Sequence, residues 1–331
     1  MAHCGLQGFK KKGARNLIKI LVAVPVLNED KSLGAVIDGI RAVKIPVARI
    51  SIVVIDDGST DDSVGISKRR GVDVISHGTN RGLGATFRSA LRYAQVNDAD
   101  ILVTIDGDGQ FDPKDIPKVV EPIIQRRADF VTASRFRNDA YTPKMSRVRL
   151  WGNRRVAWLV NRLAKTQLHD VSCGFRAYSE EAMLSLDLIG DFTYTHETIL
   201  TLAFQNLSLV EVDVHVRGKR QFGESRVARN VVWYALKTSM IILRNFRDYK
   251  PLIAFGGPAL FFGCVGLLCL FSFGVISLLL QEFYPKVLAF VGAFLLLFAT
   301  LLLITALIAD MFTRMRAQVE NIRRLLRRVN R

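Results

Sequence analysis

The chain has 331 residues, of which 50% are hydrophobic, and its formal net charge is +16. This length accommodates two domains, or one domain with an appendage. A nucleic-acid-binding protein can be this basic, but it does not need the apolar excess, and we therefore expect no nucleic-acid partner.

Residues 1–17 form a basic N-terminal tail without the apolar core of a signal peptide. The cysteines are scattered along the chain, without the spacing of a metal site or a disulfide framework. This usage is consistent with a reducing compartment, and we expect the cysteines to be packing residues.

Beyond the tail, apolar runs of strand length alternate with stretches that have apolar residues at helical spacing. The runs are rich in β-branched residues and are continuous, as in strands covered on both faces. This alternation predicts an α/β fold with a parallel, doubly wound, Rossmann-type sheet. The predicted strands are 18–25, 50–56, 72–77, 101–106 and 129–134.

Polar clusters follow four of these predicted strands. Ligands bind beyond the carboxyl ends of the strands in such sheets, so we expect the clusters to meet at one edge. No loop ends in Gly-Lys-Ser/Thr, which excludes a P-loop, and the Gly-x-Gly at 82–84 is a weak dinucleotide fingerprint. The clusters are Pro25 with Asn28-Glu29, then Asp56 to Ser59, Asn80 to Gly82, and Asp106-Gly107-Asp108.

The stretch TIDGDGQFDP, residues 104–113, places Asp106 and Asp108 one residue apart. Two carboxylates this close repel each other unless a cation lies between them, and Mg²⁺ binds to one or two carboxylates and completes its shell with waters and phosphates. An ordinary turn is also rich in Asp and Gly. The gathering of acids at one sheet edge favours the metal interpretation.

Residues 144–165 contain seven basic side chains, no acid, and interleaved Trp151 and Trp158. Such a segment suits an amphipathic helix that lies against anionic headgroups. A second interfacial helix is predicted at 227–250, because basic residues from Arg226 to Arg247 share one side at about 100° per residue.

Two long apolar runs follow. Residues 252–280 have no ionisable side chain apart from two cysteines, and residues 287–309 have none. Each exceeds the roughly 20 residues that cross a bilayer as a helix. Because only a short loop separates them, residues 251–309 are predicted to form a two-helix transmembrane hairpin.

Basic residues flank this hairpin on one side. Arginines and a lysine precede the first helix, and seven arginines follow Asp310. Positive residues stay cytoplasmic, so we expect a multi-pass cell membrane protein with its N-terminal part and both termini in the cytoplasm. In the basic tail 310–331, Val319, Ile322, Leu326 and Val329 alternate with arginine pairs, which predicts another interfacial helix.

Seven ordered motifs between residues 18 and 226 resemble the inverting family-two glycosyltransferases, most closely the dolichyl- or polyprenyl-phosphate mannose and glucose synthases. This family usually has Asp-Ala-Asp where the chain has Asp106-Gly107-Asp108. The resemblance implies a GT-A-like domain over 18–226. The motifs are VPVLNE (24–29), DDGSTD (56–61), NRGLGA (80–85), DGDGQFDP (106–113), ASRF (133–136), DVSCGFRAY (170–178) and RGKRQFGESR (217–226).

On the donor side, the resemblance implies a nucleotide-diphosphate sugar, linked to UDP or GDP. Asp106 and Asp108, with Gln110, are expected to hold Mg²⁺ or Mn²⁺ across the diphosphate. The expected donor-binding residues are Pro25, Asn28, Glu29, Asp57, Asp106, Gly107 and Asp108. Asn28-Glu29 as a helix cap is the alternative for that pair.

On the acceptor side, the resemblance implies a polyprenyl phosphate in an anionic membrane. Arginine forks match phosphate oxygens, so Arg135 with Arg147 or Arg149 is expected to hold the acceptor phosphate. Catalytic roles are expected for Asp108, Arg135 and Asp170; for Asp170 a structural salt bridge with Arg176 is equally favoured. Ser225 and Arg226 are expected on a mobile loop that closes over the diphosphate, with membrane anchoring as their alternative.

The resemblance therefore implies transfer of one sugar, with inversion, to a dolichyl or undecaprenyl phosphate. Two other hypotheses remain at this point: a glycosyltransferase with another membrane acceptor such as diacylglycerol, and a non-catalytic membrane adaptor that binds a nucleotide sugar. Assembly into a homo-oligomer through the membrane helices is a further expectation of the resemblance.

Overall fold

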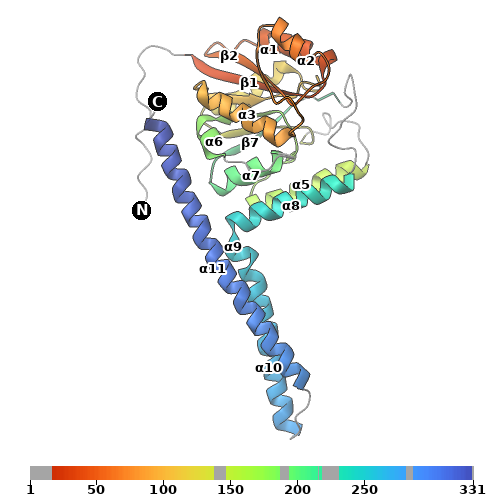
Figure 1. Cartoon of the computed structure of the whole chain (residues 1–331), viewed down its shortest axis with the longest axis vertical. Helices are drawn as coiled ribbons and strands as arrows, with labels where there is room; N and C mark the ends of the chain where they lie inside the picture. Colours follow the sequence, from red (N-terminus) through yellow and green to blue (C-terminus); the bar gives the residue numbers. More distant parts are fainter. Residues whose placement is uncertain are drawn as a thin grey trace.

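The computed structural model describes residues 17–137, 147–186, 194–214, 216–217, 231–280 and 286–329. A seven-stranded sheet with helices on both faces stands above two long helices that leave it at one end (Figure 1). The strand order is β3-β2-β1-β4-β6-β5-β7. The strands are β1 Ile18–Val26, β2 Ala48–Asp56, β3 Asp73–Ser76, β4 Ile101–Thr104, β5 Phe130–Ser134, β6 Arg176–Ser179 and β7 Leu209–Asp213.

The sheet confirms the α/β class but is mixed instead of wholly parallel. β6 runs antiparallel to both β4 and β5, whereas the pairs β1–β2, β1–β4, β2–β3 and β5–β7 are parallel. β6 has only four residues and includes the buried Arg176, so hydrophobic patterning gave no prediction for it. The other six strands point the same way, and their carboxyl ends meet at one edge.

The helices of the soluble part cover the two faces of the sheet. They are α1 Asp30–Ala42, α2 Ser63–Arg69, α3 Leu83–Val96, the 3₁₀ turn η1 Pro113–Asp115, α4 Ile116–Ile124, α5 Arg147–Ala164, α6 Glu180–Ser185 and α7 Thr195–Phe204.

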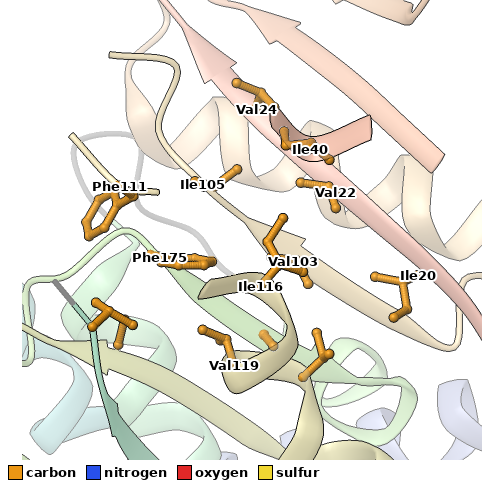
Figure 2. Close-up of a cluster of buried hydrophobic side chains, with 14 of the residues drawn as sticks. Ile20, Val22, Val24, Ile40, Val103, Ile105, Phe111, Ile116, Val119 and Phe175 are labelled. Carbon is orange, nitrogen blue, oxygen red and sulfur yellow. The ribbon is translucent and has the colours of Figure 1, made fainter. Parts of the chain in front are cut away.

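Both faces of the central strand β1 are buried, which explains why its sequence is a continuous apolar run. Ile20, Val22 and Val24 project into one core cluster together with Ile40 of α1 and Ile116 of α4, as Figure 2 shows. Leu21 and Ala23 project into a second cluster with residues of α3, α5 and α7. Full burial of each large aliphatic side chain contributes roughly 1.5–3 kcal/mol, so the sheet edge is held by a rigid support.

The chain then forms α8 Val231–Tyr249, α9 Pro251–Ala254, α10 Gly256–Leu280 and α11 Lys286–Val329. The segments Pro251–Leu279 and Lys286–Val319 are long and apolar enough to cross a membrane. The two helices pack closely because each has a glycine at one contact. A Cβ on Gly266 would lie 2.9 Å from the carbonyl oxygen of Gly292. Small residues at such contacts allow two membrane helices to approach.

The helices α5 and α8 lie side by side, crosswise to the long axis of the hairpin (Figure 1). On α5, Trp151 and Trp158 are exposed while Ala157 and Val160 are buried. On α8, Ile242 packs into the domain core. The basic residues Arg226 and Arg229 of the predicted 227–250 helix lie outside the described residues.

The tail differs from its prediction. α11 continues without a break for 44 residues, about 66 Å at 1.5 Å per residue, and passes beside the sheet domain (Figure 1). Residues 310–329, predicted as part of an interfacial helix, are therefore the coaxial extension of the second apolar segment. Thr313 Oγ1 donates a hydrogen bond to the Asp248 carbonyl oxygen at 3.0 Å and ties α11 to the end of α8.

Candidate active site

The loop with Asp106 and Asp108 leaves β4 at the carboxyl edge of the sheet. The Gly107 amide donates to the Pro25 carbonyl oxygen at 3.4 Å, and Ser32 Oγ of α1 donates to the Gly107 carbonyl oxygen at 2.8 Å. Asp108 is buried, and its Oδ1 accepts the Gln110 amide at 3.0 Å. The loop is thus fixed to the end of β1 and the start of α1.

Close packing against the end of β1 explains why residue 107 is glycine. A Cβ there would lie 3.0 Å from Val26 Cγ2 and 3.3 Å from the Pro25 carbonyl oxygen, closer than most real contacts. The alanine that is usual in the resembling family would need a small displacement of the β1 end. The departure from Asp-Ala-Asp therefore permits a closer packing of the loop on β1.

Gly174 leaves room for the Asp106 carboxylate. A Cβ on Gly174 would lie 2.9 Å from Asp106 Oδ2 and 3.0 Å from Oδ1. The Gly174 carbonyl oxygen accepts hydrogen bonds from Thr104 Oγ1 at 2.7 Å and from Tyr194 Oη at 3.4 Å. The space around this carboxylate is therefore set by backbone that β4 and the α7 end hold in place.

The carboxylates of Asp106 and Asp108 fit a Mg²⁺ or Mn²⁺ ion that binds together with a diphosphate. Among the residues the structure describes, no group of three or more His, Cys, Asp or Glu side chains is arranged to hold a metal. Two carboxylates suffice when substrate phosphates and waters complete the shell. Gln110, the third predicted ligand, donates its amide Nε2 to the Arg217 carbonyl oxygen at 3.3 Å, and its role in metal binding stays a prediction.

At the ends of β1 and β2, Asn28 shapes the turn between β1 and α1. Asn28 has a φ of 55°, and its Oδ1 accepts the Thr60 amide at 2.7 Å. The Glu29 amide donates to Ser63 Oγ at 3.0 Å. Glu29 occupies the N-cap position of α1, as the capping alternative predicted, but its side chain makes no capping hydrogen bond to the helix. Pro25 lies beside this turn, half-buried.

The carboxylate of Asp57 organises the turn after β3. Its Oδ1 lies 2.9 Å from His77 Nδ1 and accepts the Arg81 amide at 2.9 Å, and its Oδ2 accepts the Gly82 amide at 2.9 Å. These contacts use three of the roughly four acceptor positions of a carboxylate. Asp57 thus joins two of the predicted polar clusters, and its contact with a donor stays a prediction.

Its neighbour Asp56 is an ionised structural residue. The Asp56 carboxylate accepts the Ser59 amide at 2.9 Å and Ser76 Oγ at 2.6 Å. Burial raises the pKa of Asp56, but the hydrogen bonds from Ser59 and Ser76 outweigh it and leave the pKa below its ordinary value.

Arg135 and Asp170 form a bidentate ion pair at the end of β5, in which Asp170 is fully buried and Arg135 is partly buried. Arg135 Nε lies 2.6 Å from Asp170 Oδ2 and Arg135 Nη2 lies 2.9 Å from Oδ1. Burial raises the pKa of Asp170, but the Arg135 guanidinium lowers it further, and the net pKa lies below the ordinary value. For Arg135, burial lowers the pKa, but the charge and the hydrogen bonds of Asp170 outweigh it, and the net pKa lies above the ordinary value. The short segment 170–174 contacts both groups, because Asp170 binds Arg135 and Gly174 lies against the Asp106 carboxylate. The pair and the Asp106 loop thus lie in one site.

The predicted alternative for Asp170, a salt bridge with Arg176, is wrong. Arg176 is fully buried and donates to the carbonyl oxygens of Cys173 at 2.7 Å and Val171 at 3.0 Å and to Thr198 Oγ1 at 2.6 Å. Arg176 therefore fixes the loop that carries Gly174, whereas the ionised Asp170 orients Arg135 and is poorly suited to accept a proton.

Glu211 of β7 is a site residue that the sequence gave no reason to select. Its Oε1 accepts the amides of His169 at 2.8 Å and Asp170 at 2.7 Å, and its Oε2 lies 2.8 Å from His169 Nδ1. Glu211 is thus the buried support of the turn that holds Asp170. Only the pairing of β5 with β7 brings it there.

Several predicted residues are not placed by the structure. Arg147 and Arg149 belong to the first turn of α5, but their side chains lie outside the described residues. Ser225 and Arg226 also lie outside them. The first turn of α7 also buries two ionisable side chains, His196 and Glu197. Burial, followed by the charge of Arg176, lowers the pKa of His196 to about 3.

Two acidic residues on a loop at the carboxyl edge of such a sheet, together with the Arg135–Asp170 pair, are features of a GT-A-like glycosyltransferase fold. Residues 21–186, half of the chain, match the family described as glycosyl transferase family 2. The chain belongs to this family.

Relatives include synthases of polyprenyl-phosphate sugars. The dodecaprenyl-phosphate galacturonate synthase of Rhizobium johnstonii is 25% identical over 312 residues, which cover 90% of this chain and 88% of that protein. The UDP-N-acetylglucosamine–dolichyl-phosphate N-acetylglucosaminyltransferase of Methanococcus voltae is 29% identical over 215 residues, 59% of this chain and 84% of that protein.

The fold also resembles that of solved structures. Glucosyl-3-phosphoglycerate synthase from Mycobacterium tuberculosis, in complex with Mn²⁺, UDP and phosphoglyceric acid, has a TM-score of 0.54 and 21% sequence identity. The match covers 69% of this chain and 78% of that one. This likeness supports the GT-A-like fold.

Proposed function

We propose that this glycosyltransferase transfers one sugar, with inversion, from a nucleotide-diphosphate sugar to a polyprenyl phosphate at the membrane surface. The observation that carries the proposal is the placement of the Asp106–Asp108 loop and the Arg135–Asp170 pair in one site. The relative from R. johnstonii, a dodecaprenyl-phosphate galacturonate synthase, supports it because that match spans 90% of the chain.

On the donor side, Asp106 and Asp108 would hold Mg²⁺ or Mn²⁺ against the diphosphate. The bound ion supplies neutralisation of the charge that develops on the leaving nucleotide. Pro25, Asn28, Glu29, Asp57 and Gly107 would contact the donor from the ends of β1, β2 and β4. The amide and carbonyl hydrogen bonds around these residues fix the turns before the donor arrives, which lowers the ordering cost of binding.

On the acceptor side, Arg135 would bind the phosphate, helped by Arg147 or Arg149, and Asp170 would keep the Arg135 guanidinium oriented. A phosphate monoester is largely ionised near pH 7, since its second pKa is about 6. Its oxygen can therefore attack the anomeric carbon without a strong general base. A depressed pKa at Asp170 fits this division of roles.

In this arrangement α10 and the apolar part of α11 cross the membrane, and α5 and α8 lie at its surface. The exposed tryptophans Trp151 and Trp158 suit the headgroup region. The flanking arginines favour a cytoplasmic catalytic domain with both termini on the same side. Residues 18–226 would then form the catalytic domain.

The test is a transfer assay with full-length protein, Mn²⁺, labelled UDP- and GDP-sugars, and undecaprenyl or dolichyl phosphate, with diacylglycerol as a second acceptor. We expect label in the polyprenyl phosphate. Asp108→Asn should abolish transfer and leave the thermal midpoint without metal unchanged. Label only in diacylglycerol, or in neither lipid across all donors, would refute the proposed reaction; a large fall in the metal-free midpoint would make Asp108 a structural residue.

A further inference from the structure

A basic cavity lies in the sheet domain, and none of its described lining residues belongs to the Asp106 loop. Its volume is about 820 Å³. The last residues of α5 and α7, the first half of the edge strand β7, and Lys250 line it. Lys250 directly precedes Pro251, the first residue of the apolar segment, so the cavity reaches the point where the chain passes from the sheet domain into that segment.

The charges of this cavity favour an anion. Among the described lining residues, Arg137, Lys165, His169 and Lys250 are basic and Glu211 is acidic. The Glu211 side chain is almost fully buried and is occupied by His169 and by two backbone amides. The two lysines are exposed. The cavity therefore presents cations to whatever enters it.

The remaining lining favours a ligand with an apolar part. Leu163, Phe204 and Leu207 contribute apolar surface, and the Lys250 ammonium lies 5.7 Å from the centre of the Phe204 ring. An amphiphile with an anionic head and hydrocarbon chains matches this combination better than a free anion does.

Hydrogen bonds order the turn of the cavity wall that carries Lys165. Asn161 Nδ2 donates to the Leu168 carbonyl oxygen at 2.7 Å, and Asn161 Oδ1 accepts the Leu168 amide at 3.0 Å and Thr166 Oγ1 at 2.8 Å. Lys165 itself has a φ of 56°. The partly buried Asn161 thus orders the whole turn and fixes the position of Lys165.

The cavity shares a wall with the catalytic site. His169 and Glu211 line the cavity, and the same Glu211 oxygen that accepts the His169 amide accepts the Asp170 amide. Asp170 in turn holds Arg135. A charge bound against His169 is therefore three hydrogen bonds away from the guanidinium proposed to hold the acceptor phosphate.

We propose that this cavity binds the headgroup of an anionic phospholipid, distinct from the acceptor lipid, and that the bound lipid increases the rate of sugar transfer. Basic pockets at the cytoplasmic membrane surface bind such headgroups. The effect on transfer rests on the proposed function, whereas the lipid binding rests only on the placement of the cavity beside the membrane helices.

The binding test measures lipids retained by full-length protein after extraction from vesicles of phosphatidylcholine and phosphatidylglycerol, by native mass spectrometry. We expect selective retention of phosphatidylglycerol. The double variant Lys165→Gln/Lys250→Gln should weaken it roughly 30-fold, at about 1 kcal/mol for each lysine. The matched control is Lys44→Gln/Lys68→Gln, which removes two exposed lysines of the sheet domain that do not line the cavity; it should retain the lipid.

Equal loss in the control variant would overturn the proposal, because general surface charge would then explain retention. Displacement by inorganic phosphate, or by undecaprenyl phosphate, would also overturn it and identify a free-phosphate site or an acceptor site. In the transfer assay, phosphatidylglycerol should increase the rate of the wild-type and control proteins but not that of the lysine variant. A transfer rate that does not change with phosphatidylglycerol would refute only the proposed activation. Retention of phosphatidylglycerol by a protein that transfers no sugar would refute only the proposed function.

Discussion

Replacing Gly174 with alanine should weaken the binding of Mn²⁺ without unfolding the protein. The added Cβ would lie 2.9 Å from Asp106 Oδ2 and 3.0 Å from Oδ1, so the carboxylate has to move by a few tenths of an ångström. The φ of Gly174 is outside the left-handed region, and the backbone accepts alanine. Metal sites tolerate deviations of about 0.2 Å, and disturbed support of a metal ligand typically reduces affinity 10–100-fold.

The assay measures transfer rate against Mn²⁺ concentration, with Mn²⁺ binding followed by electron paramagnetic resonance in the presence of nucleoside diphosphate. We expect a 10–100-fold higher half-saturating Mn²⁺ concentration for Gly174→Ala. The control is Gly152→Ala in α5, where an added Cβ meets nothing within 4 Å and alanine favours the helix by about 1 kcal/mol. An unchanged Mn²⁺ dependence in Gly174→Ala would refute the assignment of Asp106 as a ligand.

Two further predictions concern buried charges. Asp170→Asn and Arg135→Gln should each lower the free energy of unfolding by about 3 kcal/mol or more. Because the two residues form a pair, the loss in the double variant should be smaller than the sum of the two single losses by roughly 1–3 kcal/mol. Additive losses in urea unfolding would contradict the pairing. For His196, whose pKa is lowered to about 3 by burial and then by Arg176, the folded state stays neutral below pH 6.5 while the unfolded state takes up a proton. Stability should therefore fall by up to about 2 kcal/mol from pH 6.5 to pH 5, and His196→Leu should remove that part of the slope; an equal slope in the variant would show that His196 is not its source.

Local chemistry made much of the sheet edge predictable. Continuous β-branched runs located β1 to β5 to within a few residues, because burial on both faces leaves a strong pattern. Polar clusters directly after those runs indicated which turns meet, since parallel strands place their carboxyl ends together. The structure joins them through contacts such as that of Asn28 with Thr60 and of Asp57 with Gly82.

What the sequence did not indicate depends on partners far apart in the chain. Asp170 pairs with Arg135, 35 residues away, and not with the nearby Arg176. Glu211 reaches Asp170 only because β7 lies beside β5. Such pairings follow from strand order, which hydrophobic periodicity does not encode.

Residues 310–329 show that periodicity predicts a helix but not how that helix is arranged. The periodicity of residues 310–329 is helical whether the helix lies on a bilayer or continues out of it. Only the unbroken backbone from Lys286 to Val329 distinguishes the two arrangements.

The most direct test is the position of Mn²⁺ in crystals of the protein grown with saturating Mn²⁺ and nucleoside diphosphate, located by anomalous scattering. We predict a single peak between the carboxylates of Asp106 and Asp108, in contact with the diphosphate and on the side that faces Arg135. A diphosphate bound away from these two carboxylates, or no peak between them when both ligands are saturating, would contradict the proposed site.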